Sequence, residues 1–520
     1  MSTTTTMMMM FGGAAFVGWI ATFRKRRRRG RGDRRKLRDA FAATRSEELT
    51  KNGQTLLQWI VNYRDTCREK PVLSRVQPNY LQKRLPTNAP REPESWDTIL
   101  SDMDEHIVPG LTHWEASNRF FAYFKPHSSY PAVLGELLCA GINVMGFDWI
   151  ASPAATELEG LVLDWLAKFL NLPSKFLMSS PGPGCGVIQG SAGESATVVL
   201  LAAVVRSTGR GARSEAPPAR HRLVVYCSDQ THAIVQKSTM ILGVRLHKIS
   251  TESRDGHRLR ADALERAVSK DRESGLLPIA VVATLGTTNA CGFDDLEKLG
   301  PVARRHHLWL HVDAAYGGAY ACLPELRDKF GGLEFCDSFC VNCHKKLLCP
   351  FDLAALYVGD RRPLLDALSL QPEYLRNKHS EAGLVVDYEH LQMPLGRRFR
   401  ALKLWFVFRR FGTSGLTEHV RNGLRLAKYF AGLIENDDEF EIAAPVSLSL
   451  VCFRWAGHDE DDQRRLLDAV KGTGECFIIH TKLGDRMVLR FACGGIEQTK
   501  SDVFSAFQVI KRCAVALNPL

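Results

Sequence analysis

Apolar residues recur at helical spacing in three stretches of the first 170 residues. In the first stretch, Leu56, Leu57, Ile60 and Val61 repeat at i, i+1, i+4 and i+5, which places them on one face of a helix. Patterns of this kind predict helices over residues 46–67, 96–107 and 155–170. The polar, proline-containing segment at residues 71–94 predicts an extended connection between the first two helices.

Beyond residue 180, short apolar runs alternate with helical segments. Continuous apolar runs predict buried strands at residues 223–227, 278–284, 308–312 and 338–341. Helices are predicted at residues 195–205, 231–242 and 261–269, and a glycine-rich turn at residues 181–193 precedes the first of them. This alternation indicates an α/β fold built on a largely parallel sheet with helices on both faces. A helix at residues 399–411 then leads to a smaller C-terminal part with strand-like runs at 447–453 and 486–491.

The positive charge of the chain is concentrated in one segment near its N-terminus. The formal net charge is +11. Residues 24–38 hold eleven Lys or Arg and one Asp, a net of +10, which leaves +1 for all the other residues. The remaining chain is nearly neutral, so no basic surface for DNA or RNA is predicted. The hydrophobic content of 45% and charged content of 24% of the whole chain are ordinary for a soluble globular enzyme.

The N-terminal tail combines an apolar run at residues 7–23 with the basic block that follows it. A membrane-spanning helix needs about 20 apolar residues, so the run is short for one. Three interpretations of residues 1–39 stay open: a marginal membrane anchor, an organelle-targeting segment and a disordered tail. A cleaved secretory signal fits less well, because the basic block follows the apolar run. We expect a cytoplasmic protein, with weak membrane association through residues 7–38 or organelle targeting as the alternatives.

The fourteen cysteines show no regular spacing, so reduced thiols are expected. Cys340-Val-Asn-Cys343-His344 matches the attachment pattern of c-type haem, and with Cys336 and Cys349 it resembles a zinc cluster. The segment nevertheless predicts a strand that runs into a turn, and the adjacent histidine and lysine have a better chemical explanation. We therefore predict no metal.

That explanation begins with Asp313 and Lys345, which lie thirty-two residues apart. Asp313 ends the apolar run that begins at Leu308, and Lys345 follows His344 just beyond the next apolar run. A lysine amine and a buried carboxylate, each at the end of a strand, suit pyridoxal phosphate. This cofactor needs the amine for its Schiff base and the carboxylate to hold its ring nitrogen protonated. Either residue alone is weak evidence, since lysines are often solvated and aspartates often cap helices.

The segments around these residues resemble the group II pyridoxal-phosphate decarboxylases, and among them the aromatic-L-amino-acid decarboxylases. The resemblance runs from about Leu56 to Ala514. The matching segments are Pro71-Val-Leu-Ser, Thr112-His-Trp, Phe120-Phe-Ala-Tyr-Phe, Ser152-Pro-Ala-Ala-Thr-Glu-Leu-Glu, Gly186-Val-Ile-Gln-Gly-Ser-Ala, Ser228-Asp-Gln-Thr-His, Ala283-Thr-Leu-Gly-Thr-Thr, His311-Val-Asp-Ala-Ala-Tyr-Gly and Leu395-Gly-Arg-Arg-Phe-Arg-Ala-Leu-Lys. Their order over most of the chain makes the resemblance specific.

The resemblance implies a fold-type I architecture with a mostly parallel, seven-stranded-type sheet flanked by helices. It also implies a homodimer whose active sites lie at the subunit interface. On this basis we expect a tail at residues 1–39, an N-terminal helical dimerisation segment at 40–129 and a large cofactor-binding domain at 130–402. A small C-terminal α+β domain is expected at 403–520.

The resemblance also assigns roles around the cofactor ring. Lys345 resembles the lysine that forms the Schiff base, and Asp313 resembles the partner of the ring nitrogen, whose proton affinity its charge raises. His232 resembles the histidine stacked on the ring, and Ala315 would pack on the opposite face. Thr288 resembles a residue close to the Schiff base.

The phosphate group of the cofactor calls for backbone N–H groups at a helix N-terminus and for polar side chains. Ser191 and Ala192, which open the helix after Gly190, fit that need, and Asn342 fits as a side-chain donor. We also place His344, of the His-Lys pair, among the cofactor contacts.

The chain departs from the family pattern at several positions. The family usually has Pro before the His-Lys pair and Trp after it, where this chain has Cys343 and Lys346. A serine is expected where Gly193 stands, so one phosphate hydroxyl is missing. Lys125 is also unusual and follows the Phe-Phe-Ala segment directly. Two adjacent lysines leave open which one bonds the cofactor, and the His-Lys register favours Lys345.

Three functions follow from these features. The first is decarboxylation to an amine, for which Tyr374 matches the loop tyrosine that the family uses as proton donor, in a polar segment typical of a closing lid. The second is oxidative decarboxylation and deamination to an aldehyde, whose enzymes carry phenylalanine at that tyrosine or lack the stacked histidine. The third is a catalytically impaired binding protein, which the unusual N-terminus and the departures support. Tyr374 and His232 together favour the amine.

The substrate is expected to be an aromatic L-amino acid. Trp114, Tyr123 and Phe124, in the matched N-terminal motifs, and Gly396 are the predicted substrate contacts. In the family, a glycine at the last position accompanies bulky aromatic or indolic substrates, although Gly396 could equally serve a tight turn. Tryptophan, DOPA, tyrosine and phenylalanine stay open as substrates.

Overall fold

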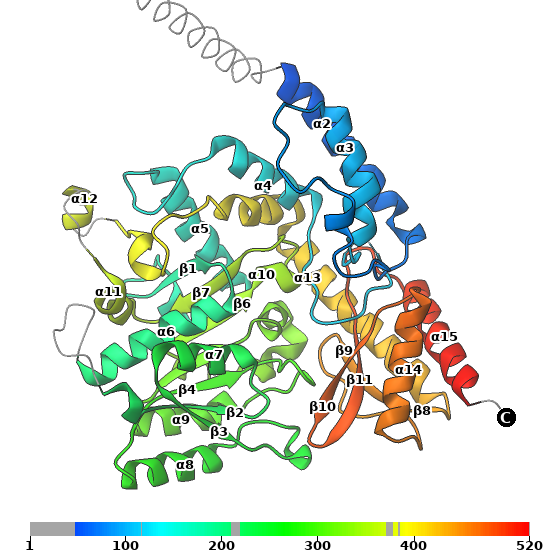
Figure 1. Cartoon of the computed structure of the whole chain (residues 1–520). Helices are drawn as coiled ribbons and strands as arrows, with labels where there is room; N and C mark the ends of the chain where they lie inside the picture. Colours follow the sequence, from blue (N-terminus) through cyan, green and yellow to red (C-terminus); the bar gives the residue numbers. More distant parts are fainter. Residues whose placement is uncertain (1–46, 116, 210–218, 371–377, 383–384, 519–520) are drawn as a thin grey trace, which may run out of the picture. The chain divides into compact units, whose positions relative to one another are not determined.

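The computed structural model of the chain (Figure 1) describes residues 47–115, 117–209, 219–370, 378–382 and 385–518. The described residues belong to two compact units. The first comprises the residues up to 70 together with 75–110, and the second comprises residues 71–74 and 111–520. The tail at residues 1–39 and Tyr374 lie outside the described residues, so their predicted roles stay predictions.

The first unit is helical. Its two α-helices are α2 (Glu47–Thr66) and α3 (Trp96–Asp102), and its short helical turns are η1 (Cys67–Glu69), η2 (Leu81–Lys83), η3 (Met103–Ile107) and η4 (Val108–Gly110). Ser95 caps α3 by accepting the N–H of Thr98 at 3.1 Å, and the indole of Trp59 donates to Asp104 at 2.9 Å. Both predicted helices are confirmed. No α2 side chain is fully buried, and Leu56, Leu57 and Val61 of its apolar face are exposed.

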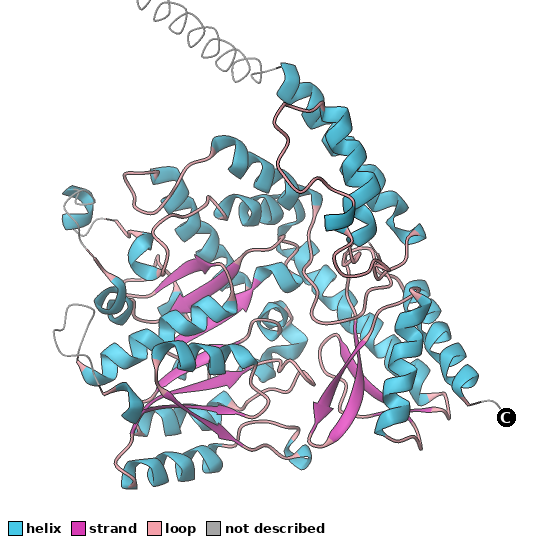
Figure 2. Ribbon diagram, in the orientation of Figure 1, coloured by secondary structure: helices cyan, strands magenta, loops and turns pink. Residues whose placement is uncertain are grey.

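A seven-stranded sheet organises the second unit (Figure 2). Its strands are β1 (Cys185–Gln189), β2 (Leu223–Ser228), β3 (Arg245–Ile249), β4 (Leu277–Thr284), β5 (Trp309–Asp313), β6 (Ser338–Asn342) and β7 (Ala354–Val358). Their order is β1-β7-β6-β5-β4-β2-β3. The pairs from β6 to β3 are parallel, while β7 runs antiparallel to both β6 and β1. The mostly parallel sheet is therefore confirmed.

Both faces of this sheet are covered. Successive side chains along a strand pack alternately into two hydrophobic cores, one on each face. In β2, Val224 and Tyr226 belong to the core that includes α5, α8 and α9, whereas Val225 and Cys227 pack with α6 and α7. The helices of this unit are α4 (Tyr130–Ile142), α5 (Pro153–Phe169), α6 (Ala192–Thr208), α7 (Ala233–Leu242), α8 (Ala261–Glu273), α9 (Leu296–Arg305), α10 (Cys343–Lys346), α11 (Arg362–Leu368), α12 (Lys378–Glu381), α13 (Ala401–Glu435), α14 (Glu460–Thr473) and α15 (Lys500–Leu517). Burial on both faces explains why the strands are continuous apolar runs.

The C-terminal part contains an antiparallel sheet of order β10-β11-β9-β8. Its strands are β8 (Phe440–Ile442), β9 (Leu450–Trp455), β10 (Ile479–Leu483) and β11 (Arg486–Ala492). This sheet shares a separate core with α14, α15 and the second half of α13, in which Phe430 stacks on Phe491 at 3.7 Å between ring centroids. Helix α13 is interrupted at Gly412, whose φ of 64° departs from helical geometry.

Two predictions about elements need correction. The segment predicted as a glycine-rich turn at residues 181–193 contains strand β1, whose five residues are all buried. Its glycine and its terminal glutamine hide the apolar signal. Strands β3, β7, β8 and β10 and helices α4, α9, α11, α14 and α15 were also not predicted. Strands β3 and β10 are half exposed, and β8 has only three residues.

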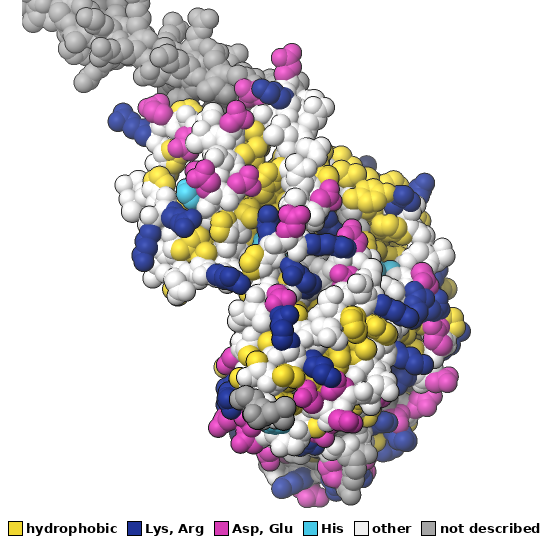
Figure 3. Space-filling model, turned by 90° about the vertical axis from the view of Figure 1, so that its right-hand side faces the viewer, with side chains coloured by type: hydrophobic (Ala, Val, Ile, Leu, Met, Phe, Trp, Pro, Cys, Tyr) yellow, Lys and Arg dark blue, Asp and Glu magenta, His cyan; other side chains and the backbone are white. Residues whose placement is uncertain are grey.

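The charge of the surface and the apolar length of the helices bear on two of the predictions. On the face shown in Figure 3, basic and acidic side chains are interspersed and no area of a single charge dominates. Among residues 47–518, apart from the undescribed gaps, no helix is long and apolar enough to cross a membrane.

Candidate active site

A pocket of about 550 Å³ opens where the parallel strands end. Asp313 and Asn342 are the last residues of the neighbouring strands β5 and β6, and Thr284 ends β4. Ligands of α/β proteins bind at this edge of the sheet. Most of the predicted site residues line this one pocket: Phe124, Ser191, Ala192, His232, Thr288, Asp313, Ala315, Asn342, His344 and Lys345.

The carboxylate of Asp313 is buried and held in one orientation. Its side chain is 5% exposed, and Oδ1 accepts the N–H of Ala315 at 3.0 Å. The backbone of this turn is fixed in its own right, since Ala314 donates to the carbonyl of Cys340 and Asn342 donates to the carbonyl of Ala315, both at 3.0 Å. One oxygen is thus committed, and the carboxylate presents a fixed negative charge to the pocket.

Lys345 lies in α10, directly after β6, and its amine reaches the pocket. Burial lowers the pKa of Lys345, and the Asp313 carboxylate opposes part of that shift. A lowered pKa increases the share of neutral amine, which is the form that attacks a carbonyl. Lys346 does not line the pocket. Its amine donates instead to the carbonyls of Cys493 and Gly494 at 3.0 and 3.2 Å.

The two histidines of the site are held in defined tautomers. His232, at the start of α7, accepts the N–H of Ile234 on Nδ1 at 3.1 Å, and His344 accepts the N–H of Leu353 on Nδ1 at 3.1 Å. When neutral, each ring therefore carries its proton on Nε2. Burial lowers the pKa of both, and that of His344 falls to about 4. Both imidazoles are neutral near pH 7.

The N-terminus of α6, where phosphate contacts are predicted, lies at the pocket. Ser191 caps this helix by accepting the N–H of Glu194 at 3.2 Å. Glu194 in turn accepts the N–H of Gly190 at 2.8 Å. A side chain at Gly190 would place Cβ 2.9 Å from that carboxylate, so it would displace the Glu194 side chain. At Gly193 a Cβ would meet nothing nearer than 3.6 Å, so the missing serine hydroxyl has no steric cause.

Two buried polar atoms of the pocket fit the presence of a cofactor. The side-chain oxygens of Thr284 and Asn342 have no hydrogen-bond partner in the described part of the chain. Buried polar groups are normally hydrogen-bonded. Both residues line the pocket, so a polar molecule bound there would satisfy them. The lysine, the carboxylate and the helix N-terminus match the carbonyl, the ring nitrogen and the phosphate of pyridoxal phosphate.

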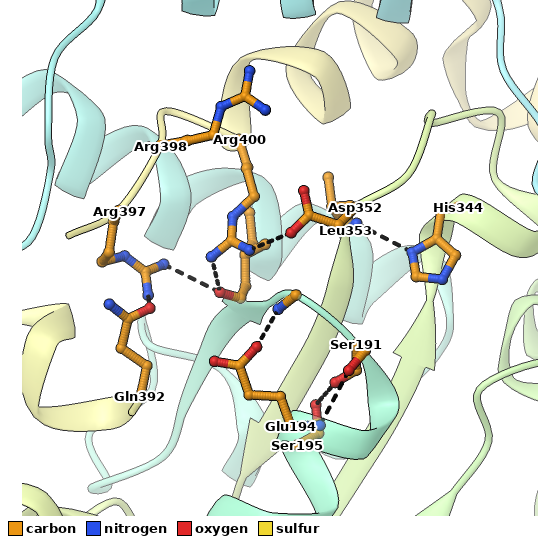
Figure 4. A network of polar contacts seen from close by, with 12 residues as sticks. Ser191, Glu194, Ser195, His344, Asp352, Leu353, Gln392, Arg397, Arg398 and Arg400 are labelled. Carbon is orange, nitrogen blue, oxygen red and sulfur yellow. Dashed lines mark hydrogen bonds and ion pairs between the residues drawn. The ribbon is translucent and has the colours of Figure 1, made fainter. Parts of the chain in front are cut away.

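Strand β1 leads into the turn at Gly190 and Ser191, which we call the phosphate turn. This strand lies at the edge of the sheet and is held there by side chains (Figure 4). The N–H of Ile188, in β1, donates to Glu159 at 2.8 Å. Its carbonyl accepts from Arg400 at 2.8 Å and from Arg397 at 3.4 Å. Arg397 also forms an ion pair with Glu159 in which both side chains are buried. These contacts replace the neighbouring strand that β1 lacks on this side.

The same network reaches the turn that holds His344. Arg400 pairs with Asp352 at 2.9 Å, and the next residue, Leu353, is the donor to His344. The phosphate turn and the His-Lys pair are therefore connected through one buried arginine (Figure 4). Because Arg397 pairs with Glu159, the matched motif at residues 395–403 also contacts the matched motif at residues 152–159.

Three predicted substrate residues do not line the pocket of this chain. Trp114 and Tyr123 are 39% and 45% exposed and stack on each other at 5.4 Å between ring centroids. Gly396 lies near Met145, whose sulfur would be 3.6 Å from a Cβ at the glycine. Only Phe124 of this group faces the pocket, where its ring stacks on Tyr316 at 3.6 Å.

Sequence reasoning missed several residues of the site. Tyr316, Phe351 and Met393 line the pocket, and Arg490 lies over Phe124 at 5.1 Å from the ring centroid. Tyr316 falls inside a matched motif and Phe351 ends the run that contains Lys345, so their positions offered a signal. Arg490 offered none, since it lies in β11, far along the chain.

The cysteine cluster shows no features of a metal site. All fourteen cysteines are free thiols and only Cys322 is not buried. Burial raises the pKa of the Cys340 thiol to about 12. The described residues contain no group of three or more His, Cys, Asp or Glu arranged to hold a metal ion.

Comparisons with known proteins agree with this geometry. The model of the pyridoxal-dependent decarboxylase conserved domain matches residues 78–456. The chain is 45% identical over 478 residues to phenylacetaldehyde synthase of Arabidopsis thaliana, covering 90% of this chain and 96% of that protein. It is 44% identical over 452 residues to aromatic-L-amino-acid decarboxylase of Bos taurus, covering 86% and 92% respectively.

A solved structure extends the similarity to three dimensions. The crystal structure of Oryza sativa TDC with PLP and tryptamine superposes with a TM-score of 0.88 at 38% identity, covering 91% of this chain and 98% of that one. The fold is accordingly that of the fold-type I enzymes, and pyridoxal 5′-phosphate is the cofactor. From the matched domain and these full-length relatives it follows that the chain belongs to the pyridoxal-dependent decarboxylase family, close to the decarboxylases of aromatic amino acids.

Proposed function

We propose that this protein decarboxylates an aromatic L-amino acid to the corresponding arylalkylamine and CO2. The observation that carries the proposal is the convergence of Lys345, Asp313 and His232 on one pocket beside an aromatic wall. When bound, the cofactor supplies an electron-withdrawing ring that accepts the electrons released as the carboxylate leaves. The protein's own task is to hold that ring protonated, to orient the substrate and to return one proton.

Three residues prepare the site for the cofactor. Lys345 offers an amine whose lowered pKa favours the neutral form needed for bond formation with the aldehyde. Asp313 offers a carboxylate fixed by the N–H of Ala315, so its charge is directed before the cofactor arrives. His232 lines the same pocket and is neutral near pH 7, which suits the stacking role that the family resemblance assigns to it.

The pocket wall suits an aromatic substrate. Phe124 is backed by Tyr316 and covered by the guanidinium of Arg490, which keeps its ring in place. Ile234, Phe351 and Met393 add apolar surface. Ligand sites of this size are mostly apolar with a few directed polar groups. The wall favours a ring over a charged side chain and leaves tryptophan, DOPA, tyrosine and phenylalanine as candidates.

We further propose that the working form is a cytoplasmic homodimer. The uncovered apolar face of α2 supports this, since Leu56, Leu57 and Val61 all remain exposed in the single chain. Light scattering of the purified protein should give twice the mass of one chain. A monomeric mass at micromolar concentration would contradict the dimer.

A second function is favoured by the phenylacetaldehyde synthase of Arabidopsis thaliana, which is 45% identical to this chain. In that reaction the amino acid, O2 and water would give the aldehyde, CO2, ammonia and hydrogen peroxide. The presence of Tyr374 supports the amine instead, because its phenol is the proposed donor of the proton to the substrate α-carbon. The two reactions differ in their need for O2 and in every product except CO2.

The test compares the wild-type protein with Tyr374→Phe. Wild-type protein should form amine and CO2 in equal amounts, with no peroxide and no consumption of O2. Removing a general acid lowers a rate by about 10²- to 10⁴-fold, so amine formation by the variant should fall by that factor while aldehyde and peroxide appear. Aldehyde and peroxide from the wild-type protein would establish the second function. Unchanged amine formation by the variant would remove Tyr374 from its role.

A further inference from the structure

Lys346 is a buried amine without a counter-ion beside the active-site lysine. Its side chain is 1% exposed, and no carboxylate of the described chain lies within ion-pair distance of it. A buried cation of this kind destabilises a fold unless other contacts compensate for it. The family usually has tryptophan at this position, so the family pattern gives Lys346 no role.

The amine of Lys346 is surrounded by Cys493, Gly494 and Gly423, which we call the socket. Nζ donates to the carbonyls of Cys493 and Gly494, which follow β11. A Cβ at Gly494 would lie 2.1 Å from Nζ, and a Cβ at Gly423, in α13, would lie 3.1 Å from it. Gly494 also has a φ of 102°, which favours glycine. The absence of both side chains therefore makes room for the lysine.

The surroundings of the socket make the charged amine costly. Burial, together with the charge of the nearby Lys125, lowers the pKa of Lys346 to about 7. The other titratable groups facing this amine are Cys493, Cys291, His127, His419 and Tyr320. The unfolded chain, in which lysine titrates at 10.5, binds more protons between pH 7 and that value. The destabilising effect is thus complete below pH 7 and fades as pH rises towards 10.5.

Helix α10 is only four residues long, and three of its side chains point to different partners. His344 is held by Leu353, Lys345 enters the pocket and Lys346 enters the socket. A helix this short makes few bonds of its own. The direction in which Lys345 leaves the backbone therefore depends on what holds its neighbours.

Strand β11, which leads into the socket, also contacts residues that line the pocket. Arg490, in β11, donates to the carbonyls of Thr288 and Asn289 at 2.6 and 3.1 Å, and its guanidinium covers Phe124. Lys346 and Arg490 thus fix β11 to two parts of the same pocket, one beside Lys345 and one beside Thr288.

We propose that Lys346 is a positioning residue, which fixes α10 and the amine of Lys345 against β11 through its two hydrogen bonds to Cys493 and Gly494. It acts on the reaction only through Lys345. The proposal rests on the proposed function, in which Lys345 bonds the cofactor. A residue retained only for packing would be expected to be apolar here, as in the family.

The test is Lys346→Met, a substitution of similar length that removes the amine. If the amine positions Lys345 and does not stabilise the fold, cofactor-free Lys346→Met should unfold at the same temperature as the wild-type protein or at a higher one. This is expected at pH 6.5, because the substitution removes a buried charge. The affinity of the variant for pyridoxal phosphate, followed by absorbance, should fall by about 10- to 100-fold, the range in which outer partners of a bound group act. Turnover should fall with little change in KM for the amino acid.

Two outcomes would overturn the proposal. One is a wild-type cofactor affinity and absorbance spectrum in Lys346→Met, and the other is a lower unfolding temperature with proportionate loss of cofactor. Borohydride trapping on the wild-type protein tests the proposed function separately from the positioning role of Lys346. Failure to trap cofactor on Lys345 would refute the proposed function, whereas trapping with an unaffected Lys346→Met refutes only the positioning role.

Lys125→Met provides a second test if Lys346→Met does not fold. Lys125 is buried, its amine has no hydrogen-bond partner in the described chain, and its charge lowers the pKa of Lys346. Without Lys125, Lys346 should stay protonated to higher pH and keep its charge-assisted hydrogen bonds. If the protonated amine of Lys346 positions Lys345, the cofactor affinity of the wild-type protein should decline as rising pH removes that proton. In Lys125→Met this decline should move to higher pH. An unmoved decline would overturn the proposal.

Discussion

Replacing Asp313 by asparagine isolates the charge of the carboxylate from its shape. The substituted side chain has the same size, and its oxygen can still accept the N–H of Ala315 that Oδ1 accepts at 3.0 Å. What is lost is the negative charge facing the pocket. Since this charge raises the pKa of both His232 and Lys345, both groups should become easier to deprotonate in the variant.

The size of the effect follows from the burial of this carboxylate. With 5% of the side chain exposed, solvent screens little of its charge. A hydrogen bond to a charged group contributes about 1.5–3 kcal/mol. At about 1.4 kcal/mol for each factor of ten, the affinity for pyridoxal phosphate should fall by about 10- to 150-fold. Turnover should fall by more, because a ring that is not held protonated withdraws electrons less strongly.

The assay titrates cofactor-free protein with pyridoxal phosphate by absorbance and then measures amine formation at saturating cofactor. Asp164→Asn is a matched control. Asp164 is also 5% exposed and accepts two backbone N–H groups, from Met178 and Ser179, at 2.8 and 2.9 Å away from the pocket. The control should lose stability and keep its cofactor affinity. Wild-type turnover in Asp313→Asn would refute the role assigned to this carboxylate.

Two further predictions concern the lysine and the network behind the phosphate turn. Lys345→Ala should abolish both the visible absorbance of bound cofactor and its trapping by borohydride, since the amine of Lys346 is committed to the Cys493 and Gly494 carbonyls; trapping on Lys346 would overturn the assignment. Arg397→Met leaves Glu159 buried without its cation, in a pair whose side chains are 1% and 5% exposed, which should lower the free energy of unfolding by about 3–5 kcal/mol. Urea unfolding measures this, and adding Glu159→Gln should restore more than half of the loss. If the double variant is no more stable than Arg397→Met, the unpaired carboxylate is not the cause.

The strands that could be predicted are those whose own residues form an unbroken apolar run. The apolar runs of β2, β4, β5 and β6 are long enough to stand out because both their faces are buried. Asp313 and Lys345 could be linked to one cofactor because each follows such a run. That they and His232 reach the same pocket agrees with the rule that parallel strands end at one edge.

Other features depend on partners that are distant in sequence. Strand β1 contains glycine and glutamine, and it is a strand because β7 and a set of buried side chains occupy its hydrogen-bonding groups. Trp114 and Tyr123 belong to matched motifs, yet in this chain they stack on each other at the surface. Lys346 was a second candidate for bonding the cofactor. The structure distinguishes the two lysines, because Lys345 lines the pocket and the amine of Lys346 is held by the carbonyls that follow β11.

The pairing of β1 with β7 has a consequence for synthesis of the protein on the ribosome. Cys185 pairs with Val358, which the ribosome adds 173 residues later (358 minus 185). Bringing such distant segments together is slow because the loop between them must first be ordered. Since β1 leads directly into the phosphate turn, the growing chain cannot complete the cofactor cradle until β7 has emerged. Cofactor capture is therefore expected late in translation, and a nascent chain that stops before residue 354 should not retain pyridoxal phosphate.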